Sequence, residues 1–202
     1  MTLWLVPLFA IWLGMVVFFR YYRVWLPYYI LGTAGCVYWF VLFFGVSLGA
    51  ETFLAQSVAW AVHLSSGLIP VPTRLFANAP GVLLVLIVAQ DKGWTILNIG
   101  VESSGVLEIS VLASCLLFYP GWSFARRAAG ALAGGIAVWT ANVLRMLLIV
   151  VLLNRLGKDA LVLAHTYVGK LVFFVLAVAI FWYLITLPTV RSLGKQLERS
   201  EA

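Results

Sequence analysis

Long apolar stretches recur along the chain, and their length restricts its fold more than any other feature. A helix needs about 20 apolar residues to cross the roughly 30 Å hydrocarbon core of a bilayer. The stretches that approach or reach that length are Thr2–Phe19, Pro27–Gly49, Gly105–Tyr119, Ala129–Leu153 and Leu161–Leu187. With 64% hydrophobic and 10% charged residues, the composition excludes an ordinary soluble domain, which carries about 25% charged residues. The sequence predicts an all-α polytopic membrane protein with five to six transmembrane helices.

Basic residues near the ends of these stretches predict the orientation. If the amino terminus is outside, the inner segments hold more Lys and Arg than the outer ones, as cytoplasmic loops of membrane proteins do. The inner set is Arg20, Arg23, Arg126, Arg127, Arg191, Lys195 and Arg199, and the outer set is Arg74, Lys92, Arg155 and Lys158. Because these charges flank apolar stretches, topology explains the pI of 9.6 better than nucleic-acid binding does. We expect a multi-pass protein of the plasma membrane.

Residues 51–104 hold the least regular pattern. Phe53–Ile69 is apolar but interrupted by polar residues, which favours an interfacial or re-entrant helix, with a sixth crossing as the alternative. Val82–Ala89 and Trp94–Val101 flank the turn sequence 91–93, so they predict a small extracytoplasmic β-hairpin. The chain then forms one membrane domain with two spans in 1–50, the interfacial helix and hairpin in 51–104, three spans in 105–187 and a cytoplasmic tail in 188–202.

Three chemically active residues stand at or inside the apolar stretches: Ser103, Arg145 and His165. A charged side chain in a bilayer is costly enough to need a reason, and the predicted orientation puts all three toward the outer leaflet. A hydroxyl or thiol that attacks a carbonyl needs a base such as histidine, and a guanidinium can stabilise the resulting oxyanion. The set therefore predicts an acyl-transfer site. Asn142 shares a helical face with Arg145 and could orient the guanidinium or bind substrate.

The order and spacing of these residues resemble a known family. Glu102-Ser103-Ser104-Gly105, then Asn142-Val143-Leu144-Arg145, then His165 are similar to the motifs of the exosortase and archaeosortase family, over roughly Val82 to Phe174. The resemblance implies a multispanning cysteine-type transpeptidase that cleaves C-terminal sorting signals, each made of a short motif, a hydrophobic helix and a basic tail. It implies catalytic roles for Ser103, Arg145 and His165, an acceptor of unknown identity, and no cofactor. The substrate-binding or supporting candidates are Glu102, Ser104, Gly105, Asn142 and Lys170.

One position departs from the family pattern. Where the family has cysteine, this chain has Ser103, which leaves a naturally serine-bearing member, an inactive paralogue or an engineered substitution as interpretations. Serine keeps the size of cysteine but forms no ready thiolate, so we favour an engineered or degenerate serine over an efficient serine nucleophile. Cys115 lies twelve residues further on, about 18 Å toward the inner side, and is expected to be a packing residue.

Other roles for the same residues stay open. Arg145 could snorkel or pair with Glu108, His165 could be a packing residue, and His63 is expected to be an interfacial polar residue. A second enzyme class is an intramembrane serine hydrolase, although 102–105 lack the Gly-x-Ser-Gly pattern of rhomboid-like enzymes. A third class is a transporter or assembly subunit that uses Arg145 and His165. No metal is expected, because the two histidines lack partners at ligand spacing.

Overall fold

The structure is a computed structural model that describes residues 4–69, 71–76, 84–90, 93–99 and 104–191. Its α-helices are α1 (Leu5–Tyr21), α2 (Trp25–Phe40), α3 (Ala50–Ser66), α4 (Val106–Leu117), α5 (Phe124–Leu156) and α6 (Lys170–Phe181). The strands are β1 (Thr73–Phe76), β2 (Leu84–Gln90) and β3 (Gly93–Ile99). Shorter helical segments are the π-helices η1 (Val41–Ser47), η4 (Leu163–Gly169) and η5 (Trp182–Thr186) and the 3-10 helix η3 (Lys158–Ala160).

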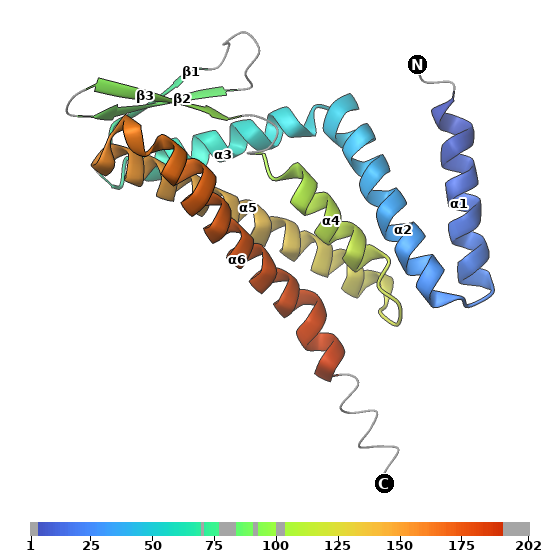
Figure 1. The fold of residues 1–202 in the computed structure, drawn as a ribbon. Coiled ribbons are helices and arrows are strands. Elements are labelled where there is room, and N and C mark those ends of the chain that lie inside the picture. Colours follow the sequence, from blue (N-terminus) through green and yellow to red (C-terminus); the bar gives the residue numbers. More distant parts are fainter. Residues whose placement is uncertain (1–3, 70, 77–83, 91–92, 100–103, 192–202) are drawn as a thin grey trace.

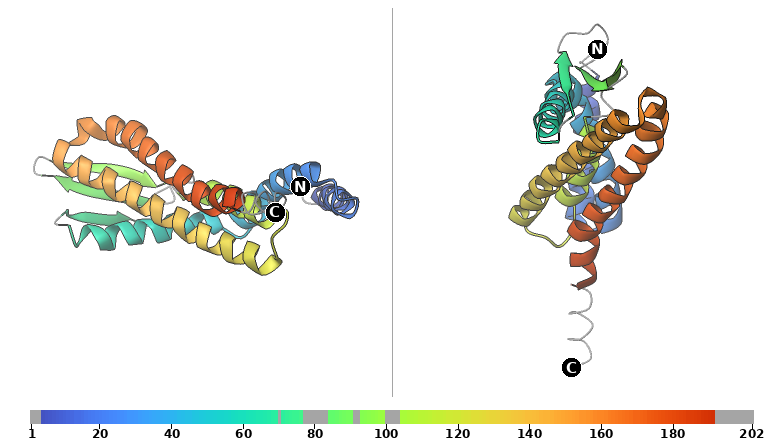
Figure 2. Two further views of the ribbon diagram at one scale, coloured as in Figure 1. Left: turned by 90° about the horizontal axis from the view of Figure 1, so that it is seen from below. Right: turned by 90° about the vertical axis from the view of Figure 1, so that its left-hand side faces the viewer.

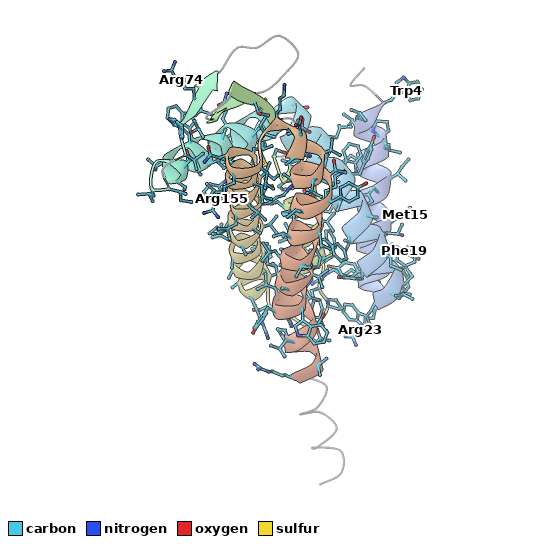
Figure 3. All side chains as sticks on the ribbon, turned by 60° about the vertical axis from the view of Figure 1, so that its left-hand side comes forward. Trp4, Met15, Phe19, Arg23, Arg74 and Arg155 are labelled. Carbon is cyan, nitrogen blue, oxygen red and sulfur yellow. The ribbon has the colours of Figure 1, made fainter. Side chains whose placement is uncertain are left out.

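The helices run back and forth between two ends of an elongated molecule (Figure 1). The sheet end holds the β-sheet, α3, the start of α1 and the connection from α5 to α6. The tail end holds the α1–α2 turn, the α4–α5 turn and the last described turns after α6. Arg74 lies at the sheet end and Arg23 toward the tail end (Figure 3). The two ends of the described chain therefore lie at opposite ends of the molecule.

Three helical segments are long and apolar enough to cross a membrane: Trp25–Phe43, Phe124–Leu156 and Lys158–Arg191. They overlap the second, fourth and fifth apolar stretches of the sequence, so the expected all-α class fits and the chain is a helical membrane protein. α1 and α4 are apolar but shorter, with 17 and 12 residues. The number of crossings and the orientation stay predictions.

The start of α5 differs from the sequence prediction. The helix begins at Phe124, five residues before the expected Ala129, because Ser123 caps it: the Ser123 hydroxyl accepts a hydrogen bond from the Arg126 backbone N–H at 3.4 Å. Serine at this position satisfies an N–H group that the first turn of a helix leaves without a partner. The first, polar turn of α5 was missed since hydropathy marks only the apolar part of a helix.

Two apolar clusters hold the helices together. At the sheet end, one face of α3 packs over the C-terminal half of α5 through Ala55, Val58, Ala59, Val62, Val143, Met146, Ile149, Val150 and Leu153. Trp139 of α5 also donates its indole N–H to the Ser57 hydroxyl of α3 at 2.9 Å. The second cluster joins α4, α5 and α6 through Leu112, Leu116, Val138, Ala141 and Phe173. The segment expected as an interfacial or re-entrant helix is therefore a helix packed on α5.

Close approach of α4 and α5 depends on glycine. A Cβ atom at Gly134 would lie 2.6 Å from the Leu112 side chain and 3.1 Å from that of Leu184. The absence of a side chain at Gly134 therefore permits the close packing of α4 and η5 on α5. At the tail end, Arg127 donates hydrogen bonds to the carbonyl oxygens of Trp122 and Leu117, at 2.9 and 3.1 Å, and so holds the α4–α5 turn.

α1 lies at one side of the molecule, beside α2 (Figure 2). The Trp12 indole N–H donates to the Leu31 carbonyl oxygen at 2.9 Å, and its ring fills the space above Gly35, where a Cβ atom would lie 1.8 Å from the ring nitrogen. Tryptophan is large and rigid, so Trp12 helps to hold α1 against α2, together with the edge-to-face contact of Phe9 with Trp39.

The β-sheet covers α3 and the C-terminal end of α5 (Figure 1). It is antiparallel with the order β1-β2-β3, and its register pairs Leu86 with both Leu75 and Leu97. β2 and β3 occupy the segment for which a hairpin was expected, while residues 91–92 of the expected turn lie outside the described residues. β1 was not anticipated from the sequence, because it has only four residues. It joins α3 through Thr73, whose hydroxyl is hydrogen-bonded to His63 Nδ1 at 2.7 Å.

Candidate functional site

A pocket of about 560 Å³ opens between α4 and α6 near the sheet end. Its walls come from η1, the first turns of α3 and α4, the middle of α5 and the first half of α6. Most of its surface is apolar, but four charged side chains reach it. The lining residues are Val41, Glu51, Val106, Leu107, Glu108, Arg145, Lys170, Phe173, Phe174 and Ala177. We take this pocket as the candidate functional site.

Arg145 is the buried cation of the pocket. Its side chain is 5% exposed, and the guanidinium carbon lies 5.4 Å from the centre of the Phe173 ring. A guanidinium over an aromatic face is attracted by the ring's quadrupole, most strongly where water is excluded. The middle of α5 therefore presents a permanent positive charge to an apolar cavity.

The start of α4 rests against the same face of α5. Gly105 is the residue before α4 and has φ +75°, a conformation that glycine adopts without a steric penalty. A Cβ atom at this position would lie 3.4 Å from Asn142 Nδ2, and Asn142 is fully buried. Ser104, also fully buried, accepts a hydrogen bond from the Val106 backbone N–H at 3.2 Å. Gly105 and Asn142, which are far apart in sequence, thus meet beside Arg145.

Two of the predicted site residues cannot be placed. Glu102 and the expected nucleophile position, Ser103, lie outside the described residues. Ser104 and Gly105, which follow them directly in the sequence, belong to the described part and lie at the start of α4. The described site therefore consists of Ser104, Gly105, Asn142, Arg145 and Lys170, together with pocket residues that the sequence did not single out.

His165 lies nearer the sheet end than the pocket does. It is half-buried in η4, eight residues before Phe173, which at an α-helical rise is about 12 Å along the axis. The packing of η4 on α5 fixes this register, because a Cβ atom at Gly169 would lie 2.8 Å from Ile149 Cδ1. Among the described residues that line the pocket, Lys170 is present and His165 is not.

Glu51 is the pocket residue that sequence reasoning missed. It stands in the first turn of α3, and its carboxylate lies against Gly45 of η1. Within the described residues, no side-chain hydrogen bond or ion pair joins Glu51, Glu108 or Lys170 to another group. Acidic residues are common in first helical turns, where they interact favourably with the helix dipole, so nothing in the sequence separates Glu51 from an ordinary helix start.

Two other candidates from the sequence lie away from the pocket. Cys115 is half-buried near the end of α4, where its side chain is hydrogen-bonded to Tyr29 of α2. His63 belongs to a small network with Thr73 and Ser66 between α3 and β1. The described residues contain no group of three or more His, Cys, Asp or Glu side chains that could hold a metal ion.

The fold places the chain in the class of helical membrane proteins, with a mixed-charge pocket set among apolar helices. No protein-family model, no curated protein and no solved structure matches the chain. Its function is therefore argued from the pocket and from the order of its sequence motifs.

Proposed function

We propose that the chain is an exosortase-like membrane transpeptidase or peptidase that processes C-terminal sorting signals, with Ser103 at the nucleophile position. One observation carries the proposal: buried Arg145 lines a pocket beside the start of α4, which begins shortly after Ser103 in the sequence. The contact of Gly105 with Asn142 supports it further, since this contact joins the two motifs of the resemblance.

The proposed reaction begins with attack by the nucleophile on a peptide carbonyl of the sorting signal. His165 takes the proton of the attacking group, and Arg145 stabilises the negative charge on the carbonyl oxygen. When the C–N bond breaks, His165 returns the proton to the departing amine, which leaves an acyl-enzyme. An acceptor with a free amine or hydroxyl, or water, then attacks this intermediate, restores the nucleophile and releases the processed protein.

The proposed topology has five spans, with the amino terminus outside and the tail 188–202 in the cytoplasm. It is supported by the alternation of the helices between the sheet end and the tail end (Figure 1). In this topology the sheet and α3 lie at the extracytoplasmic face, where the reaction takes place. Arg20 and Arg126 then lie near the cytoplasmic interface, beside the aromatic rings of Tyr28 and Trp122, an arrangement typical of membrane boundaries.

The identity of the nucleophile is tested by restoring a thiol. Cys36 and Cys115 are replaced by alanine, so that Ser103→Cys introduces the single thiol of the chain. We expect a thiol-reactive probe to label this variant in membranes, and we expect it to cleave a test protein that carries a short motif, a hydrophobic helix and a basic tail. The same background with Ser103 retained should do neither, or cleave far more slowly, because a serine forms no ready thiolate.

Arg145 provides the second arm of this experiment. In the Ser103→Cys background, Arg145→Met should lower cleavage about 100-fold or more, the usual effect of removing an oxyanion donor, while labelling of the thiol persists. Arg155→Met is the matched control, since Arg155 is exposed at the end of the same helix, and it should leave cleavage unchanged. A folded Ser103→Cys protein that neither reacts nor cleaves would contradict the proposal, as would cleavage that appears only when Cys115 is restored.

A transporter or assembly subunit is the second candidate function. It is favoured by the charged side chains of Glu51, Glu108 and Lys170, which reach an apolar pocket and have no ion pair among the described residues. Charged groups inside helical membrane proteins often mark ion or proton pathways. Anion- or proton-dependent transport by reconstituted vesicles, lost in Arg145→Met and accompanied by no covalent adduct in Ser103→Cys, would support this function instead.

A further inference from the structure

An apolar groove along α6 lies next to the pocket. A second hollow, of about 300 Å³, lies on the outer side of this helix and its extension η5. It is lined by Phe174, Ala177, Val178, Phe181, Trp182 and Thr186. Phe174 and Ala177 line the pocket of Arg145 as well, so the two hollows lie next to each other. None of the groove residues is charged.

The groove has the length and spacing of a helix-binding surface. Each of its residues stands three or four positions from another of them, so they lie along one side of the helix. From Phe174 to Thr186 the groove extends about 18 Å at an α-helical rise, toward the tail end. The small side chains of Ala177 and Val178 lie between the larger Phe174 and Phe181, and small residues let two helices approach closely within a membrane.

α6 belongs to the least buried of the three helical segments that are long enough to cross a membrane. Only 6% of the most apolar stretch of Lys158–Arg191 is buried inside the protein, against 50% for Phe124–Leu156. Its inner face packs on α4 and α5 through Phe173, Leu176, Ile180 and Leu184. The groove side remains open, with Phe174 and Trp182 exposed.

We propose that this groove docks the hydrophobic helix of the sorting signal, parallel to α6. The inference rests on the proposed function, which supplies a substrate with a hydrophobic helix directly after its cleavage motif. A helix in the groove holds that motif at Arg145, because the groove and the pocket share a wall. The docked helix then runs toward the tail end, beside the last turns before Arg191, so that the basic tail of the signal reaches the cytoplasmic side of the proposed topology.

Crosslinking tests the docking without requiring catalysis. The protein with Ser103, Cys36→Ala and Cys115→Ala receives one new cysteine, in Ala177→Cys or in Ala179→Cys, and the test substrate carries single cysteines along its hydrophobic helix. Ala177 lines the groove, whereas Ala179 is exposed on the same helix outside it. Oxidation in membranes should crosslink the Ala177→Cys variant to substrate positions about 3.6 residues apart, and the Ala179→Cys variant to few or none. Equal crosslinking of both variants, or none with Ala177→Cys, would overturn the docking site.

A second pair of variants separates this inference from the proposed function. In the active Ser103→Cys background, Val178→Trp fills the groove, while Val175→Trp adds the same bulk at an exposed position outside it. We expect KM to rise about tenfold with Val178→Trp and kcat to change little; Val175→Trp should leave both near their starting values. If Val178→Trp does not change cleavage, the groove is not the docking site, while the proposed transpeptidase activity is not contradicted. If the substrate crosslinks to Ala177→Cys at helical intervals but is never cleaved, the transpeptidase proposal is contradicted and the docking site is retained.

A lipid acyl chain is the competing occupant of the groove. A photoactivatable phospholipid in the same membranes should label the groove side of α6 and be displaced by an excess of the test substrate. Labelling that the substrate does not reduce, together with no substrate crosslinks, would assign the groove to lipid and reject the proposal.

Discussion

The contact between Gly105 and Asn142 gives the sharpest prediction, since it joins the two sequence motifs of the site. Gly105 has φ +75°, so any other residue there is strained by about 1–2 kcal/mol. The nearest neighbour of a new Cβ atom, Asn142 Nδ2 at 3.4 Å, is at the limit of ordinary contact. Gly105→Ala should therefore cost little beyond the backbone strain, whereas the extra methyl groups of Gly105→Val meet the asparagine and should add about 1–3 kcal/mol of overpacking.

Gly49 is a matched control for the backbone. It also precedes a helix in the left-handed conformation, with φ +67°, but a Cβ atom added there would meet no neighbour within 4 Å among the described residues. Gly49→Ala and Gly49→Val should lower stability through strain alone. The difference between the valine and alanine variants should therefore be larger at Gly105 than at Gly49 by about 1–3 kcal/mol.

Thermal unfolding in detergent, followed by the fraction of protein that remains monodisperse after heating, measures these differences. Asn142→Ala removes the crowded side chain, so combining it with Gly105→Val should recover part of the loss, a coupling that a double-mutant cycle isolates. Equal valine-minus-alanine differences at the two glycines, or no coupling with Asn142→Ala, would refute the packing of the two motifs against each other.

Two further predictions concern the packing of α5. Gly134→Ala should destabilise the protein by about 1–3 kcal/mol through overpacking, while Gly135→Ala, whose nearest neighbour would lie at 3.7 Å, should be close to neutral in the same unfolding assay. Equal effects would contradict the close approach of α4 and α5. Trp139→Phe removes the hydrogen bond to Ser57 and should lower stability by about 1 kcal/mol. The exposed Trp60 serves as its control, and a larger loss with Trp60→Phe would argue against this link between α3 and α5.

The sequence predicted the helices well because apolar length is a local property. α2 with η1, α5, and α6 with its flanking segments overlap stretches recognised from hydropathy alone. Their ends were less accurate, since they depend on caps such as Ser123, whose effect does not appear in hydropathy. The short strand β1 was missed for a related reason: four residues carry too weak a pattern, and its position depends on the contact of Thr73 with His63 of α3.

The candidate site could be predicted only in part, because a pocket forms between elements that are distant in sequence. Arg145 was singled out by its cost within an apolar helix and Asn142 by its place on the same helical face, while Lys170 was named among the supporting candidates. Glu51 was missed, since a carboxylate at a helix start is ordinary until the fold brings α3 beside α4 and α6. The predicted roles of Ser103 and His165 stay predictions, because Ser103 lies outside the described residues and His165 is half-buried nearer the sheet end.

The number of residues in the π-helical segment η4 sets which side chains of α6 face the pocket. A π turn holds about one residue more than an α turn, and each residue of a helix turns the chain by about 100°. Deleting one residue within Leu163–Gly169 would leave a long apolar helix, able to insert as before. It would also rotate Lys170 and Phe173 relative to Ala164, and so carry the aromatic ring away from Arg145. Insertion into the membrane and assembly of the pocket are thus separate requirements on this helix, and a deletion of one residue would satisfy the first while breaking the second.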